Sequence, residues 1–270
     1  MNRVLTVILT KDREKEFERA VSSLLGQETD IFILGKPISK ILRRDIKRAF
    51  EFSGQKLILK EGEFKLWHRN IGLNYAKKKG YKYIFFMDDD NIIPDNYLSR
   101  LVEKMEENKE IIGASGVIIT YSKLKEKKYK QWRGIRKGKY FKKRGQEIII
   151  KDKKVFLTTK IQVIPFKNYR KEIEVDYFVN SWLQRLDKNL KIRFPRFEIL
   201  GEEMAYTYML GKQGKLIVYQ DLYMFHIPVE YGGTRERKDF GKYDREKEFK
   251  KVFKFILGFE PLQIIEKRVR

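Results

Sequence analysis

Short apolar runs alternate with helical patterns through the first half of the chain, and this alternation is the strongest constraint on its fold. The runs have the length of strands and lie at residues 3–9, 31–35, 56–60 and 82–87. Nearly continuous apolar runs of this kind are typical of buried parallel strands. Between them, apolar residues recur at helical spacing, as Phe17, Val21 and Leu24 do. Strands that alternate with helices predict an α/β protein with a mostly parallel central sheet and helices on both faces.

The remaining elements are predicted from the same patterns. Helices are expected at about 65–79, 94–108 and 201–211, and strands at 111–121, 215–219 and 222–227. Residues 175–186 are expected to run into a short helix. Near the end of the chain, Val252, Phe253 and Ile256 share one face of a predicted amphipathic helix.

Three consecutive acids, Asp88, Asp89 and Asp90, follow the apolar run at 82–87. In open α/β sheets, ligands bind outside the carboxyl ends of the strands, which is where these acids would lie. Carboxylates are hard oxygen ligands suited to Mg²⁺ or Mn²⁺, and a divalent ion bound there would hold a diphosphate. The alternative is a solvated acidic turn, because Asp and Asn are common turn residues.

Other polar residues are expected near the same edge of the sheet. The loop at 10–12 follows the first strand, so the right-handed crossover rule places it in one crevice with the acids. Asp12 is the expected N-cap of the next helix. Arg69 carries a rigid guanidinium fork suited to a phosphate or a base edge, and an ordinary surface arginine is the alternative. Glu202 and Glu203 lie in the first turn of a helix predicted late in the chain. The helix dipole favours acidic residues there, whether or not they have a function.

The composition excludes several classes of protein. Of the 270 residues, 42% are hydrophobic, which is enough for a sizeable core and disfavours global disorder. The chain contains no Cys, which excludes disulfides and thiolate metal sites. No apolar run approaches the ~20 residues of a membrane-spanning helix, and the first residues do not have the pattern of a secretory signal peptide. A cytoplasmic location is therefore expected.

The charge is strongly basic, with 60 Lys and Arg against 37 Asp and Glu, a formal net charge of +23. Such an excess indicates an anionic partner, although high Lys and Glu content without Cys is also typical of proteins from hot environments. Residues 122–145 concentrate the excess, with twelve Lys or Arg residues against Glu126, and Trp132 and Tyr140 among them. We hypothesise that this insertion, helped by the amphipathic segment at 249–259, attaches the protein to an anionic membrane surface. A solvated loop of a thermophilic protein is the alternative.

Five landmarks in a fixed order resemble a known family. They are the run VLTVILT, the segment RNIGLNYA that starts at Arg69, the strand that ends in DDD, the helix start GEE at 201–203, and His226 after a late strand. Over residues 3–228 this set resembles the inverting, nucleotide-sugar-dependent glycosyltransferases of family 2. The resemblance implies a GT-A fold with a Rossmann-like sheet, and a transferase of the hexosyltransferase type that uses Mn²⁺ or Mg²⁺.

The resemblance also implies a role for each matching residue. The residues that would bind the nucleotide sugar are Thr10, Asp12, Arg69, Asp88 and Asp89. Asp90 and Asp88 would hold the metal, with His226 as a further ligand. Glu203 would be the general base, and Glu202 beside it would contact the acceptor or exchange roles with it.

Two departures from the family pattern bear on these roles. Many relatives carry an Asp for the nucleotide base after the second strand, whereas this chain reads Gly35-Lys36-Pro37 there, so uridine recognition is not implied. The base position holds Glu203 where the family has an Asp, and the glutamate side chain is one methylene longer.

The implied organisation is one GT-A domain at 1–228, with a nucleotide-sugar half at 1–98 and an acceptor half at 99–228 that contains the basic insertion. A C-terminal lid and helical tail at 229–270 would follow. The implied partners are a nucleoside-diphosphate sugar and a glycan, lipid-linked or protein acceptor, with the protein peripheral on the inner face of the membrane. A basic nucleic-acid-binding protein and a non-catalytic relative of the fold are the alternatives. Nucleic acid is disfavoured because the acids at the strand ends would repel a polyanion.

Overall fold

The structure, a computed structural model, describes most of the chain. The described residues are 3–35, 38–120, 142–143, 146–151, 154–160, 172–178, 181–187, 190–197, 201–226, 245–258 and 263–269. Within them the strands form a ten-stranded sheet and a separate three-stranded sheet.

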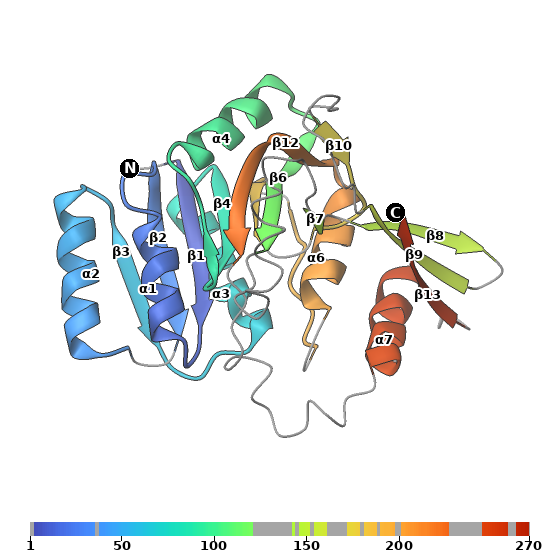
Figure 1. Cartoon of the computed structure of the whole chain (residues 1–270), viewed down its shortest axis with the longest axis horizontal. Coiled ribbons are helices and arrows are strands. Elements are labelled where there is room, and N and C mark those ends of the chain that lie inside the picture. Colours follow the sequence, from blue (N-terminus) through green and yellow to red (C-terminus); the bar gives the residue numbers. More distant parts are fainter. Residues whose placement is uncertain are drawn as a thin grey trace, which may run out of the picture.

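Parallel strands joined by helices make up the first half of the main sheet (Figure 1). In chain order the elements are β1 Val4–Thr10, α1 Glu14–Ser22, β2 Thr29–Gly35, α2 Lys40–Phe52, β3 Leu57–Glu61, the 3₁₀ turn Leu66–His68, α3 Arg69–Lys79 and β4 Tyr83–Asp88. Strand β1 pairs in parallel with β2 on one side and β4 on the other, and β3 continues the sheet beyond β2. These elements confirm the predicted alternation of strands and helices.

Two apolar layers cover the two faces of this sheet. Successive side chains of a strand point to opposite faces, and β1 follows this rule. Ile8 packs in one cluster with Phe17 of α1 and Ile46 of α2, whereas Val7 packs in the other with Leu73 of α3. The doubly covered sheet explains why β1 reads as a continuous apolar run.

The second half of the sheet contains a strand where a helix was predicted. After α4 Tyr97–Glu107 and β6 Ile111–Thr120, strand β11 Trp182–Arg185 lies between β4 and β6 and runs antiparallel to both. The prediction of a short helix at 175–186 is therefore wrong. Trp182 and Leu183 are fully buried in this slot, and pairing with two neighbouring strands overrides the helical spacing of the local sequence.

The strands predicted at 215–219 and 222–227 form one strand, β12 Lys215–His226, with a shift of register between Tyr219 and Tyr223. It runs parallel to β6 and antiparallel to β10 Glu172–Glu174. Its last residues pair with β5 Asn91–Ile92, so that His226 lies opposite Asn91. This pairing brings the late histidine to the turn that carries the three acids.

The C-terminal segments lie beside α6 Glu202–Gly211. Helix α7 Arg245–Leu257 buries Val252 and Phe253 against Tyr177, Met204 and Ala205. This packing buries part of the apolar face of the tail, and membrane contact by the segment at 249–259 stays a prediction. The three-stranded sheet consists of β8 Gln146–Lys151, β9 Lys154–Lys160 and β13 Gln263–Val269.

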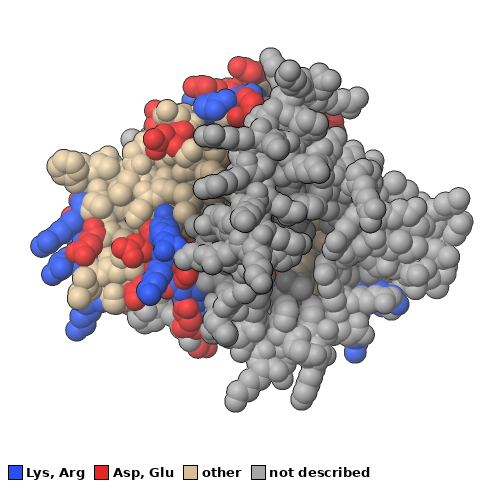
Figure 2. All heavy atoms as spheres, in the orientation of Figure 1, with Lys and Arg blue, Asp and Glu red and all other residues tan. Residues whose placement is uncertain are grey.

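Most of the basic insertion lies outside the described residues. Within 122–145, only β7 Lys142–Lys143 is described, and it pairs with β6. On the face drawn in Figure 2, the described helices α1 and α2 carry both acidic and basic side chains. Among the described helices, none combines the length and the apolar character that a membrane span requires.

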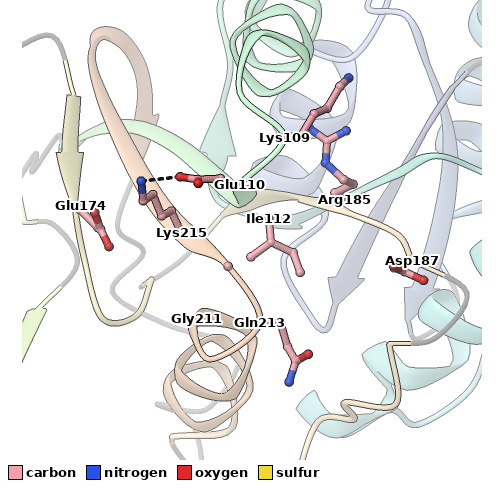
Figure 3. A pocket seen from close by; sticks show the side chains of 10 residues that line it. Lys109, Glu110, Ile112, Glu174, Arg185, Asp187, Gly211, Gln213 and Lys215 are labelled. Carbon is pink, nitrogen blue, oxygen red and sulfur yellow. Dashed lines mark hydrogen bonds and ion pairs between the residues drawn. The ribbon is translucent and has the colours of Figure 1, made fainter.

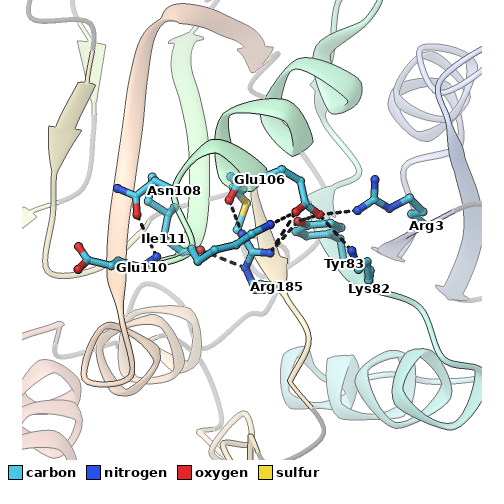
Figure 4. Close-up of polar contacts among 10 residues, drawn as sticks. Arg3, Lys82, Tyr83, Glu106, Asn108, Glu110, Ile111 and Arg185 are labelled. Atoms are coloured by element: carbon cyan, nitrogen blue, oxygen red, sulfur yellow. Dashed lines mark hydrogen bonds and ion pairs between the residues drawn. The ribbon is translucent and has the colours of Figure 1, made fainter.

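At the amino edge of the sheet, Glu106 of α4 joins several elements (Figure 4). Its Oε1 accepts hydrogen bonds from Tyr83 Oη at 2.6 Å and from Lys82 Nζ at 3.3 Å. Arg185 of β11 lies 3.9 Å from its Oε2. These contacts fix α4 against the starting end of β4, so they are at the opposite edge of the sheet from Asp88.

Candidate active site

The three acids lie on a turn that the surrounding sheet holds in place. Asp88 is the last residue of β4, and Asn91 begins β5. The Ser181 hydroxyl accepts hydrogen bonds from the Asp88 amide at 3.0 Å and from Asn91 Nδ2 at 2.6 Å. Asn91 and Ser181 are both fully buried. The acidic turn is therefore a fixed part of the carboxyl edge and not a solvated loop.

Arg69, the first residue of α3, links this turn to the start of α6. Its Nη2 donates to Asp88 Oδ1 at 2.8 Å, and its Nη1 lies 2.7 Å from Glu203 Oε1 and 3.6 Å from Glu202 Oε1. The Arg69 side chain is only 3% exposed. In this arrangement Arg69 is a buried counter-ion for both groups of acids, whereas the sequence predicted a contact with the donor.

The two glutamates differ in their access to solvent. The Glu203 side chain is 22% exposed and that of Glu202 is 3% exposed. A general base must reach the proton of an incoming hydroxyl group. The exposure difference favours Glu203 as the predicted base, whereas the burial of Glu202 disfavours its predicted contact with the acceptor.

Burial shifts the ionisation of these acids towards the neutral form. Burial raises the pKa of Glu202 to about 7, although Arg69 opposes the shift. Burial likewise raises the pKa of Asp89 to about 7 against the effect of Arg13, and it raises the pKa of Asp88 above its ordinary value. Several carboxylates in one poorly solvated place favour the binding of additional positive charge.

The raised pKa of Glu202 predicts a dependence of stability on pH. A carboxyl group whose pKa is higher in the folded than in the unfolded state stabilises the fold at low pH, and this contribution is lost as pH rises to about 7. We expect Glu202→Gln to reduce the loss of unfolding free energy between about pH 4.5 and pH 7. Urea denaturation of both proteins across this range measures the effect. Parallel pH profiles for the two proteins would contradict the assignment.

Position 201, which precedes α6, requires a glycine for two reasons, its backbone conformation and a close contact with α7. Its φ is +97°, in the left-handed region, and a Cβ there would lie 2.3 Å from Val252 Cγ2 of α7. We expect Gly201→Ala to reduce the free energy of unfolding by about 2–4 kcal/mol, from backbone strain and overpacking together. Gly26→Ala is the matched control, because Gly26 has a φ of +75° and no neighbour within 4 Å of the added Cβ. Equal losses in urea denaturation would contradict the packing of α7 on Gly201.

The end of β1 lies beside a pocket of about 240 Å³. The residues around it are Thr10, Lys11, Asp12, Arg13, Glu14, Ile38 and Ser39.

Asp12 has a φ of 56°, and the N-cap of α1 is Arg13. The prediction of Asp12 as the N-cap is therefore wrong, because the chain makes a left-handed turn at Asp12 before the helix begins.

Gly35, the last residue of β2, packs tightly on Thr10. A Cβ on Gly35 would lie 2.7 Å from the Thr10 carbonyl oxygen and 2.6 Å from its Cγ2. The close approach of these two strand ends leaves no room for a side chain at this position. Position 35 therefore offers no side chain to a ligand at this edge of the sheet.

The acids and His226 have the chemistry of a divalent-cation site. His226 Nε2 lies 3.5 Å from Asp90 Oδ2, and Asp90 Oδ1 is buried with no hydrogen-bond partner among the described residues. Within the part of the chain that the structure describes, no three His, Cys, Asp or Glu side chains are grouped as ready ligands of one ion. Mg²⁺ is usually bound by one or two carboxylates together with substrate phosphates and water, and Asp90, assisted by His226, fits that pattern.

A larger pocket, of about 580 Å³, lies at the opposite edge of the sheet (Figure 3). It is lined by Lys109, Glu110, Arg185 and Lys215, among others, and Lys215 Nζ is paired with Glu110 Oε2 at 2.5 Å. None of the predicted site residues lines this pocket. The larger volume of this pocket therefore does not identify it as the site of reaction.

Two residues of the site were missed by sequence reasoning. Arg13 donates to Asp89 Oδ1 at 3.1 Å and to Asp90 Oδ2 at 3.0 Å, and Ser181 fixes the acidic turn. Arg13 directly follows the loop at 10–12 that was expected to face the acids, and this position was the available signal. Nothing in the local sequence marks Ser181, because its role depends on the placement of β11 beside β4.

Comparisons with known proteins identify the class to which this chain belongs. Residues 6–178 match the sequence pattern described as glycosyl transferase family 2. The match covers more than half of the chain, which belongs to this family. It confirms the predicted glycosyltransferase class, and no curated protein sequence gives a significant match.

Solved structures support the fold. The chain is similar to S. aureus TarS 1-349, with a TM-score of 0.56 and 15% sequence identity, over 95% of this chain and 64% of that chain. It is also similar to GalNAc-T7 solved with UDP, GalNAc and Mn²⁺, with a TM-score of 0.54 and 12% identity, over 84% of this chain and 44% of that chain. The chain therefore spans less than two thirds of the length of either structure. The similarity confirms the predicted α/β fold of the GT-A type.

Proposed function

We propose that the protein transfers a sugar from a nucleoside-diphosphate sugar to an acceptor hydroxyl group, with inversion at the anomeric carbon and with dependence on Mn²⁺ or Mg²⁺. The observation that carries the proposal is the Arg69 link, which brings Asp88 at the end of β4 and Glu203 at the start of α6 to one guanidinium. Acids from sequence positions more than a hundred residues apart thus meet at the edge where α/β sheets bind ligands.

In the proposed site, the donor lies along the carboxyl edge from the pocket at Thr10 to the acidic turn. Asp88 and Asp89 would face the nucleotide sugar, and Asp90 with His226 would hold the cation. GalNAc-T7 was solved with UDP and Mn²⁺, which supports a nucleoside diphosphate and a divalent ion as the ligands of this chain. When bound, the cation stabilises the negative charge of the leaving diphosphate.

The transfer itself requires one proton acceptor. The acceptor oxygen attacks the anomeric carbon and gives its proton to Glu203, the bond from that carbon to the donor phosphate oxygen breaks, and the nucleoside diphosphate leaves with the electron pair. Attack opposite the leaving group inverts the configuration. The dipole of α6 favours the carboxylate form of Glu203, and Arg69 holds its Oε1 in place.

The acceptor is proposed as a glycan, a lipid-linked molecule or a protein. Attachment to an anionic membrane through residues 122–145 remains a proposal that rests on their basic composition.

The anomeric configuration of the product tests the proposal directly. The protein is incubated with UDP-, GDP- and dTDP-sugars and Mn²⁺ in the presence of simple glycan and lipid-linked acceptors, and the product is followed by NMR. The expected result is a product of inverted configuration from at least one donor. A product of retained configuration would contradict the role of Glu203 as a base in direct displacement.

A further inference from the structure

Arg13 holds two carboxylates of the acidic turn. A single nitrogen, Nη1, donates to Asp89 Oδ1 and to Asp90 Oδ2, and the side chains of the arginine and the two acids are 14%, 9% and 10% exposed. Water and salt screen such a buried group of charges much less than an ion pair on the surface. Arg13 is also the N-cap residue of α1 without a side-chain cap, so its side chain serves the acids and not the helix.

The oxygen that Arg13 occupies is also a candidate ligand for the cation. Asp90 Oδ2 accepts from Arg13 and lies 3.5 Å from His226 Nε2. A hard divalent ion binds carboxylate oxygens at about 2.0–2.6 Å. An ion at that distance from Asp90 would lie next to the guanidinium, and two positive groups this close repel each other.

We propose that Arg13 is the built-in counter-ion of Asp89 and Asp90, and that it competes with the divalent cation for Asp90. This inference rests on the proposed function, because it uses the cation site assigned there. One guanidinium supplies one positive charge to two acids. Arg13 therefore compensates the acids only in part, which leaves the site able to take up a doubly charged ion.

The competition couples cation binding to donor binding. Arg13 lines the pocket at Thr10 and Ser39, so a guanidinium displaced from Asp90 stays beside the proposed donor site. When the cation binds alone, it separates the Arg13 guanidinium from its carboxylates, and no other anion takes their place. When a nucleoside diphosphate binds as well, its phosphates give the guanidinium a new anionic partner. Arg13 thus weakens the binding of the cation alone and favours joint binding of cation and donor.

The binding of Mn²⁺ alone to the full chain, followed by electron paramagnetic resonance, tests the proposal. We expect Arg13→Gln to bind Mn²⁺ about ten-fold tighter or more, because the competing charge is removed. Arg13→Lys keeps the charge and should remain close to the wild type. Arg19→Gln, an exposed arginine six residues further along α1, is the charge-matched control and should leave the affinity unchanged.

The possible outcomes separate this inference from the proposed function. Binding of Mn²⁺ to the wild type together with UDP or GDP would support the cation site. If Arg13→Gln then binds Mn²⁺ alone no tighter than the wild type does, the proposed competition is wrong although the cation site stands. If no protein binds Mn²⁺ with or without either nucleotide, the inference and the cation site both fail.

A second measurement on the wild type keeps the test decisive if Arg13→Gln does not fold. Arginine-directed dicarbonyl labelling is read residue by residue by mass spectrometry. Saturating Mn²⁺ should increase the labelling of Arg13 relative to Arg19, because the ion releases the guanidinium from its acids. Unchanged labelling of Arg13 would overturn the proposal.

Discussion

Glu203→Gln should reduce sugar transfer by about 10²-fold or more while leaving donor and cation binding intact. The substitution removes the proton acceptor, but the glutamine keeps a carbonyl oxygen that accepts from Arg69 at the position of Glu203 Oε1. Turnover is measured with the donor that shows activity, and donor affinity is measured by calorimetry with Mn²⁺.

Glu202→Gln is the side-by-side comparison for this prediction. Glu202 is the more deeply buried of the pair, and burial raises its pKa to about 7, so its replacement should reduce transfer less. If Glu203→Gln transfers sugar at nearly the wild-type rate and Glu202→Gln does not, the two roles are reversed. Activity in both variants would contradict a catalytic role for the start of α6.

Asp90→Asn should abolish cation-dependent binding of the donor without unfolding the protein. The asparagine retains an oxygen for Arg13 but loses the charge that a hard cation requires. Loss of an outer-shell partner alone typically reduces metal affinity by about 10–100-fold, and the loss of a direct ligand should have at least this effect. Calorimetry with a nucleoside diphosphate and Mn²⁺ measures it.

Asp95→Asn provides the matched control for Asp90→Asn, because it removes an exposed acid five residues away. It should bind the donor and Mn²⁺ as the wild type does. Unchanged cation-dependent affinity in Asp90→Asn would show that Asp90 is not a ligand, and an equal loss in both variants would indicate a general effect of charge.

The parts of the fold that follow from local pattern were predicted from the sequence. Strands β1, β2 and β4 are buried on both faces, so each appears as a continuous apolar run, and apolar residues recur at helical spacing in the helices between the strands. Strand β11 was not predictable in this way. Trp182–Arg185 has only four residues, and its strand conformation comes from the slot between β4 and β6. The packing of α7 on Gly201 likewise depends on contacts between distant segments.

The acids of the candidate site and Arg69 were named from the sequence, whereas Arg13 and Ser181 were missed. Asp88 to Asp90 were recognisable because they follow a buried strand, and Glu202 and Glu203 because they open a helix after a glycine. The sequence placed Arg69 at the donor, whereas the structure buries it between Asp88 and Glu203. Contacts of this kind depend on the geometry of distant elements, so residue type alone does not reveal them, although the position of Arg13 directly after the loop at 10–12 was a signal.

Thermal stability of the wild type and of Asp90→Asn with UDP-, GDP- and dTDP-sugars, each with and without Mn²⁺, tests the central claim most directly. Under the proposed function, at least one nucleotide sugar stabilises the wild type in the presence of Mn²⁺, by about 2.7 kcal/mol at 100 times its Kd. The same ligand should stabilise Asp90→Asn far less. The account is contradicted if no nucleotide sugar stabilises the wild type, or if the ligand stabilises Asp90→Asn equally.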